Sequence, residues 1–212
     1  MIDVFVSRPT WISTELQDGL DSFYNLLKTL EFNPRSLGTA DYTPSAPLDA
    51  IIQIMSKCYG AIILGYPQIN VKDGTVKSEA IQSPLLLATE WNHIEAGLAY
   101  ARQLPLLVIH HTGVVRGIFD RGASNRFIYE VDLSDPRWTL KDPLSGAIRS
   151  WKTEIITFHN SQPRDSQADR PFCPNCSTPQ RRIYLTRLPG VYQQAFDATH
   201  QCPKCMYREK VD

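Results

Sequence analysis

The feature that most constrains the fold is a helical pattern that runs directly into an apolar strand pattern between residues 89 and 109. In its first part, large apolar residues recur at spacings of three and four, which predicts a helix that buries one face. These residues are Trp91, Ile94, Leu98 and Ala101. Residues 104–109 are almost all apolar, as is typical of a strand covered on both faces. A helix joined to such a strand indicates a parallel sheet packed against helices.

The same alternation extends over the first three quarters of the chain. Further apolar segments that predict strands lie at 2–7, 60–65 and 127–133. Further helical patterns lie at 14–31, 48–57 and 143–158. We therefore expect a doubly wound α/β domain over residues 1–159, with a mainly parallel, five-stranded sheet. Residues 160–171 are polar and predict a linker.

Several residues with useful chemistry follow the expected strands, at the sheet edge where ligands bind in such folds. Ser7 and Arg8 follow the first strand, and Tyr66 follows the strand at 60–65. Asp73 lies in an Asp-Gly turn of a long connection, and long connections are often functional. No G-x-G-x-x-G or G-x-x-x-x-G-K-[ST] segment is present, so the standard dinucleotide and P-loop phosphate sites are excluded.

Glu95 is the most informative acidic residue of this pattern. It lies four residues after Trp91, one turn further along the edge of the expected apolar face. A carboxylate at such a place costs free energy unless it is paired or faces a cavity. Two interpretations stay open at this point: a catalytic or binding acid, or a structural residue at the surface or in a salt bridge near Arg102.

Four of the five cysteines form two Cys-x-x-Cys pairs separated by 25 residues: Cys173, Cys176, Cys202 and Cys205. This spacing predicts a tetrathiolate zinc site, with a disulfide framework or a redox-active Cys-x-x-Cys pair as the alternatives. Residues 172–212 are therefore expected to form a zinc ribbon, with strand-like segments at 182–187 and 190–196. Four thiolates leave no open coordination position, so the zinc is expected to be structural.

The charge balance limits the classes of partner. The chain has 22 basic and 22 acidic side chains, which does not support attraction of the whole molecule to nucleic acid or to an anionic membrane. The residues from 160 onward are slightly basic, which allows a nucleic-acid partner without indicating one. No segment approaches the roughly 18 apolar residues of a membrane span, and no signal-peptide pattern is present. We expect a soluble cytoplasmic protein.

The order of these segments resembles the TIR domain. The resemblance is carried by the strand Asp3-Val-Phe-Val-Ser7, a helix, a loop, a helix with its strand, and then Trp91-x-x-x-Glu95 on a helix. The chain is also similar to the nucleoside 2-deoxyribosyltransferases, whose glutamate lies in a Glu-x-Gly-x-Ala helix, as in Glu95-Ala-Gly-Leu-Ala99. Both families have a flavodoxin-like fold and break an N-glycosidic bond. The resemblance covers residues 2–158, and the zinc ribbon lies outside it.

The TIR resemblance implies an NAD glycohydrolase in which Glu95 is the catalytic carboxylate and NAD is a substrate rather than a cofactor. It also implies a homo-oligomer in prokaryotic defence or signalling, with the zinc ribbon mediating assembly or docking a protein. The second resemblance implies a deoxyribosyltransferase that uses the same glutamate on a nucleoside. A third hypothesis, a module that senses a nucleotide without turnover, remains open.

Four further residues have expected roles around the cleavage site, and two aspartates are candidates for proton transfer. Trp91 is expected to wall the ribose pocket, and Tyr66 to stack on a base, unless both are plain core or rim aromatics. Ser7 and Arg8 are expected to bind substrate or to be ordinary loop residues. Cleavage of a neutral nucleoside requires a proton for the departing base, and Asp73 or Asp41 are the candidates for this role.

Overall fold

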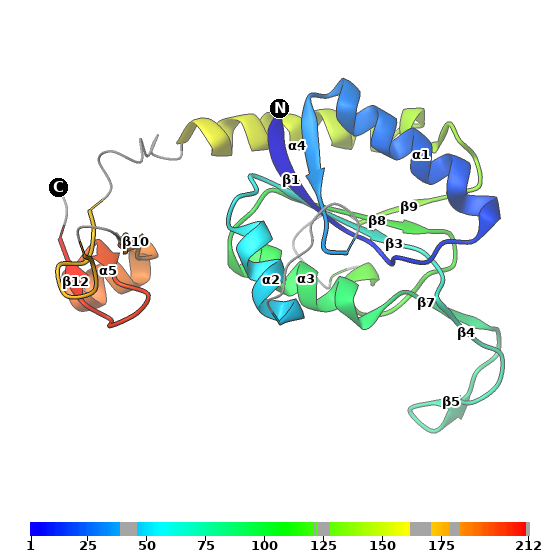
Figure 1. Cartoon of the computed structure of the whole chain (residues 1–212). Helices are drawn as coiled ribbons and strands as arrows, with labels where there is room; N and C mark the ends of the chain where they lie inside the picture. Colours follow the sequence, from blue (N-terminus) through cyan, green and yellow to red (C-terminus); the bar gives the residue numbers. More distant parts are fainter. Residues whose placement is uncertain (39–45, 121, 123–127, 162–170, 179–182, 211–212) are drawn as a thin grey trace. The chain divides into compact units, whose positions relative to one another are not determined.

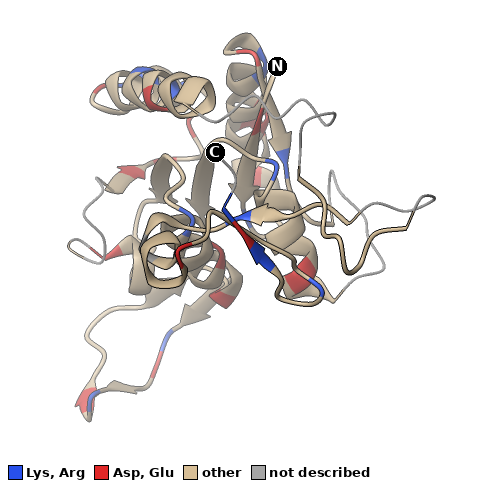
Figure 2. Cartoon of the chain, turned by 90° about the vertical axis from the view of Figure 1, so that its left-hand side faces the viewer, with Lys and Arg blue, Asp and Glu red and all other residues tan. Residues whose placement is uncertain are grey.

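The structure, a computed structural model, describes residues 1–38, 46–120, 122, 128–161, 171–178 and 183–210 (Figure 1). The chain divides into two compact units, Met1–Ser161 and Gln162–Asp212. The first unit has two hydrophobic cores and the second has a small core of its own. Residues of both charge signs are interspersed along the ribbon (Figure 2). Within the described ranges, no helix combines the length and the apolar character that a membrane crossing requires.

The first unit is built on a five-stranded parallel sheet. In chain order its strands are β1 (Ile2–Ser7), β2 (Phe32–Arg35), β3 (Ala61–Gly65), β8 (Leu106–His111) and β9 (Ile128–Val131). In space the order is β2-β1-β3-β8-β9, and every neighbouring pair is parallel. The predicted α/β class with a mainly parallel five-stranded sheet is confirmed.

Helices pack against both faces of this sheet. The four helices are α1 (Thr14–Thr29), α2 (Pro47–Met55), α3 (Glu90–Ala101) and α4 (Leu144–Ser161). Successive strand residues point to opposite faces. Val4 and Val6 accordingly belong to the core that contains α1 and α4, whereas Phe5 belongs to the core that contains α2 and α3. Two 3-10 turns, η1 (Gly117–Phe119) and η2 (Trp138–Leu140), complete these cores.

The buried face of α3 differs from the expected one. Trp91 and Ile94 are exposed. The buried residues are Asn92, Glu95, Ala96 and Ala99. The predicted apolar face of this helix is therefore wrong, because α3 packs on the sheet through small alanines rather than through its large side chains. The small residues allow a close approach, and they place the two polar residues against the sheet as well.

The long connection between β3 and α3 forms two antiparallel ribbons. One pairs β4 (Ile69–Val71) with β7 (Leu85–Leu87), and the other pairs β5 (Thr75–Val76) with β6 (Glu79–Ala80). Figure 1 shows this segment extending away from the sheet. At its base, the backbone N–H of Val115 donates to the carbonyl of Leu86 at 3.1 Å, which anchors the ribbon to the loop after β8.

In its described residues, the second unit contains a three-stranded antiparallel sheet and one short helix. The strands are β10 (Thr186–Arg187), β11 (His200–Gln201) and β12 (Arg208–Glu209), in the order β10-β11-β12. Residues 190–196, which were expected to be strand-like, form α5 (Gly190–Phe196), so this prediction is wrong. Tyr192 and Phe196 lie one helical turn apart and their rings stack with centroids 6.1 Å apart, which favours the helix.

Candidate functional site

Three polar side chains meet at the carboxyl end of β1, inside the first unit. Ser7 is the last residue of β1, and Asn92 and Glu95 lie one turn apart on the sheet-facing side of α3. All three are buried. The amide Nδ2 of Asn92 donates to the hydroxyl oxygen of Ser7 at 2.9 Å. The hydroxyl of Ser7 also acts on Glu95, whose pKa it lowers as a hydrogen-bonding neighbour. The sheet edge expected from the sequence therefore brings Ser7 and Glu95 together.

Glu95 is a buried carboxyl group, with a side chain that is only 8 % exposed. Burial raises the pKa of Glu95 to about 7, because water no longer solvates the charged form, and the hydrogen bond from Ser7 partly offsets this increase. Among the residues that the structure describes, no cationic side chain forms an ion pair with Glu95. The expected salt bridge to Arg102 is absent there, and Arg102 is exposed at the end of α3.

Arg8 directly follows Ser7 in the chain, and two tyrosines hold its side chain on the face of the sheet that α1 covers. Its Nε donates to the hydroxyl of Tyr24 at 2.9 Å, and one terminal nitrogen donates to the hydroxyl of Tyr66 at 3.3 Å and to the carbonyl of Pro9 at 2.9 Å. No carboxylate pairs with Arg8 in the described part of the chain. Tyr66 is fully buried, so its ring supports Arg8 and has no exposed face on which a base could stack.

The other expected site residues lie at more open positions. The Trp91 side chain is 43 % exposed on the first turn of α3. Asp73 is exposed between β4 and β5, and it forms no ion pair to another described residue. Asp41 lies outside the described residues. The structure thus joins Ser7 to α3 and Arg8 to Tyr66, and it leaves Asp73 on the ribbon.

Sequence reasoning missed Asn92, Thr89 and Tyr24. The hydroxyl of Thr89 donates to Oδ1 of Asn92 at 3.1 Å, so this threonine supports the amide from the residue before α3. A signal was present, because Asn92, Glu95, Ala96 and Ala99 recur at helical spacing just as the large apolar residues do. The larger hydrophobic side chains concealed it.

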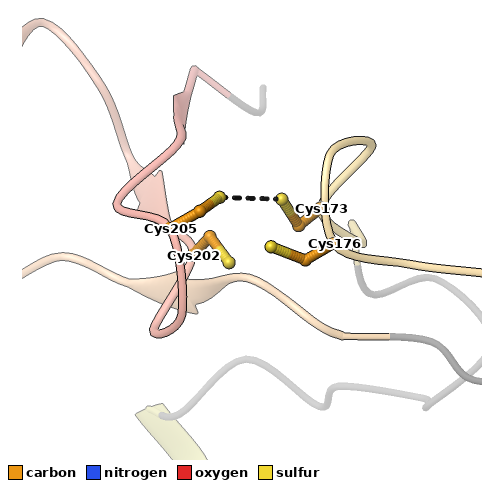
Figure 3. Close-up of side chains that lie close together, drawn as sticks. All are labelled: Cys173, Cys176, Cys202 and Cys205. Carbon is orange, nitrogen blue, oxygen red and sulfur yellow. Dashed lines mark hydrogen bonds between the residues drawn. The ribbon is translucent and has the colours of Figure 1, made fainter.

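The four paired cysteines form a second candidate site in the other unit. Their Sγ atoms all lie within 4.8 Å of one another, and none of the four is in a disulfide (Figure 3). Cys173 Sγ and Cys205 Sγ are 3.5 Å apart. A tetrahedral zinc ion with bonds of about 2.3 Å separates its sulfur ligands by roughly 3.8 Å. The cluster therefore has the donor set and the size to hold a metal ion such as zinc.

The backbone around the two cysteine pairs is nearly the same. In the first pair, the N–H of Ser177 donates to the carbonyl of Cys173; in the second, the N–H of Met206 donates to the carbonyl of Cys202, both at 3.1 Å. Each of these leading cysteines is fully buried and also donates its own N–H to a carbonyl further along the chain. The two turns thus present their sulfurs to one point from opposite sides, as Figure 3 shows.

Comparison of the chain with models of known protein families gives no match, and comparison with curated proteins gives none either.

Proposed function

We propose that the α/β unit cleaves the N-glycosidic bond of NAD or a related nucleotide, with Glu95 as the catalytic carboxylate. The observation that carries this proposal is a buried carboxylate at the carboxyl edge of a parallel sheet, without a cationic partner among the described residues. Ligands of α/β sheets bind at this edge. An unneutralised buried carboxylate attracts positive charge strongly, because the low local dielectric weakens screening.

The chemistry of such a reaction suits a single acid. The bond between ribose C1′ and the pyridinium nitrogen of NAD breaks with its electron pair going to nitrogen, so nicotinamide leaves neutral and needs no proton. The remaining ribosyl group passes through an oxocarbenium-like state, which a carboxylate beside C1′ stabilises or traps covalently. Water then adds to C1′ and loses a proton. Ionised Glu95 supplies the required negative charge.

Arg8, which follows Ser7 at the end of β1, favours a phosphorylated substrate over a free nucleoside. Arg8 is half-buried and held in place by Tyr24 and Tyr66, and a carboxylate does not neutralise it in the described chain, so its guanidinium is suited to a phosphate group. The exposed ring of Trp91 is available to contact ribose or base. The strand order β2-β1-β3-β8-β9 supports the expected doubly wound, flavodoxin-like class.

The cysteine cluster is proposed to bind structural zinc. Four thiolates complete a tetrahedral shell, so the metal contributes to folding of its unit and not to the reaction. We further propose that this zinc ribbon serves assembly into a homo-oligomer or docking of a protein partner, in a cytoplasmic defence or signalling setting.

Nucleotide turnover by the parent protein and by Glu95→Gln tests the proposal. We expect the parent, at high protein concentration, to release nicotinamide from NAD, and Glu95→Gln to lose this activity at least about a hundredfold, because the amide carries no charge. Exposed Glu90, on the same helix, provides the matched control Glu90→Gln. Because the reaction uses ionised Glu95, the rate is expected to increase with pH through about 7.

The substrate panel separates the alternatives. Nicotinamide riboside has the same scissile bond as NAD without phosphate, so a preference for NAD supports the role of Arg8. Release of free base from neutral nucleosides would instead identify a deoxyribosyltransferase-like enzyme. Equal rates for the parent and Glu95→Gln would contradict the site. Binding of NAD without turnover, with equal affinity in both proteins, would identify the non-catalytic module.

A further inference from the structure

The Asn92 side chain is an unusual constituent of a helix–sheet interface. It has no exposed surface, and its contact with Ser7 joins residues 85 positions apart in the chain. A buried amide costs free energy unless its donor and acceptor are both satisfied. Here both are: Nδ2 donates to Ser7 and Oδ1 accepts from Thr89. An apolar residue would pack at this place without such partners, so the amide has a use beyond packing.

The donors and acceptors of these hydrogen bonds are arranged in one order, from Thr89 through Asn92 and Ser7 to Glu95. The Thr89 hydroxyl donates to Oδ1 of Asn92, which turns Nδ2 toward Ser7. The Ser7 oxygen therefore accepts a hydrogen bond from the amide, and its own proton is left to donate elsewhere. Glu95, its other hydrogen-bond partner, can only accept when it is ionised. Each group thus determines the orientation of the next.

We infer that Asn92 and Thr89 are positioning residues that hold the Ser7 hydroxyl in the orientation that donates to the carboxylate of Glu95. The inference rests on the proposed function for its use: the orientation favours the ionised form of Glu95, which the glycosidic cleavage needs. It does not rest on turnover for its test, because the ionisation of Glu95 is measurable without any substrate.

Among the described residues, no charged side chain forms an ion pair that would favour the ionised form of Glu95. The titratable or charged residues on the elements packed against α3, or next to them, are Asp3, Arg8, Asp49, Lys57, Cys58, Tyr59, Tyr66, His110, His111, Arg116 and Asp120. On α3 itself they are Glu90, His93, Tyr100 and Arg102. Burial raises the pKa of Glu95 and the Ser7 hydrogen bond lowers it. A change in the orientation of Ser7 is therefore expected to change this pKa directly.

The test compares Thr89→Val with Thr89→Ser in the full-length protein. Valine has the shape of threonine but cannot donate a hydrogen bond. Asn92 is then free to turn its Oδ1 toward Ser7 and to accept the hydroxyl proton that Ser7 otherwise donates to Glu95. Serine keeps the donor. The pKa of Glu95 is read from the carboxyl carbon resonance of ¹³C-labelled glutamate, assigned by its absence in Glu95→Gln. We expect an upward shift of about 0.5 to 1 in Thr89→Val and little change in Thr89→Ser.

Ser7→Ala removes the hydroxyl that donates to Glu95, so it measures the largest increase in the pKa of Glu95 that loss of this hydrogen bond can cause. A comparable increase in Ser7→Ala and Thr89→Val, with a parent-like pKa in Thr89→Ser, supports the inference. A pKa that increases in Ser7→Ala but stays parent-like in Thr89→Val overturns it, because Ser7 would then keep its orientation without Thr89. If the pKa responds as expected but no nucleotide is cleaved, the proposed function fails while the positioning role stands.

Discussion

At the scale of single residues, the burial of Glu95 has a cost in stability. Its pKa is about 7 in the folded protein, above the ordinary value of a free glutamate near 4.5. The folded state therefore holds a proton more tightly than the unfolded state, and stability decreases as pH increases between these two values. Each pKa unit corresponds to about 1.4 kcal/mol, so the full cost above pH 7 is roughly 3 kcal/mol.

Glu95→Gln is accordingly expected to stabilise the protein in a pH-dependent way. At pH 8 the free energy of unfolding should increase, because glutamine removes the buried charge. The cost of roughly 3 kcal/mol for ionised Glu95 is the upper bound of this increase. At pH 5 the gain should be far smaller, because Glu95 is already mostly protonated there. Urea unfolding at both values measures this difference. Glu90→Gln should change little at either pH, and an equal gain at both values for Glu95→Gln would contradict the buried charge.

The sequence predicted the identity of this acid but not its surroundings. Spacing and composition indicated Glu95 as a carboxylate with an unusual place on its helix, and the strand ends indicated Ser7 and Arg8. Asn92 was missed because an amide beside large apolar residues gives no hydrophobic signal. Its role depends on Ser7, 85 positions away, and local periodicity carries no information about such a pairing.

At the scale of elements, the prediction was accurate where a segment is strongly apolar or amphipathic and failed where tertiary context decides. β1 was predicted with its observed bounds. β2 was missed because it contains Asn33 and Pro34, which weaken a strand signal; as an edge strand it tolerates a residue that cannot donate a backbone hydrogen bond. The short helix α5 was mistaken for a strand, because a segment of only seven residues that includes two aromatic side chains fits both the helical and the strand pattern.

Alanine substitutions at two helical glycines are expected to change stability in opposite directions. A Cβ at Gly19 of α1 would lie 1.9 Å from the carbonyl oxygen of Leu133, whereas a Cβ at Gly97 of α3 would meet nothing within 4 Å. We expect Gly19→Ala to destabilise the first unit by about 1–3 kcal/mol through overpacking. Gly97→Ala should stabilise it by roughly 0.5–1 kcal/mol, because alanine restricts the unfolded chain.

Thermal unfolding monitored by circular dichroism measures both effects. The two variants add the same methyl group to the same residue type in a helix, so each serves as the control for the other. A stabilising effect of Gly19→Ala would mean that α1 does not approach the loop after β9 as closely as described.

At the scale of the whole molecule, the two compact units are held by different forces. The first has extensive apolar cores on both sides of its sheet. In the second, the core found among the described residues consists of Leu185 and the cysteines Cys173 and Cys202, with Cys176, Ile183 and Tyr207 partly buried against them. A core of this size cannot offset the entropy of ordering the chain, so metal binding is expected to supply the folding free energy of the second unit.

Zinc removal should therefore unfold the second unit and leave the first intact. All four tryptophans, Trp11, Trp91, Trp138 and Trp151, lie in the first unit, so tryptophan fluorescence reports on that unit alone. With a chelator, we expect release of one zinc ion per chain and an unchanged urea midpoint by tryptophan fluorescence. Far-ultraviolet circular dichroism should lose only the small contribution of the second unit. Cys173→Ser should behave like the chelated parent.

Cys58→Ser is the matched comparison for this experiment, because Cys58 is buried in the first unit and outside the metal cluster. It should lower the tryptophan midpoint while leaving one zinc ion bound, the reverse of Cys173→Ser. A decrease in the tryptophan midpoint on chelation would show that the metal also stabilises the sheet unit. The two units would then fold as one cooperative whole.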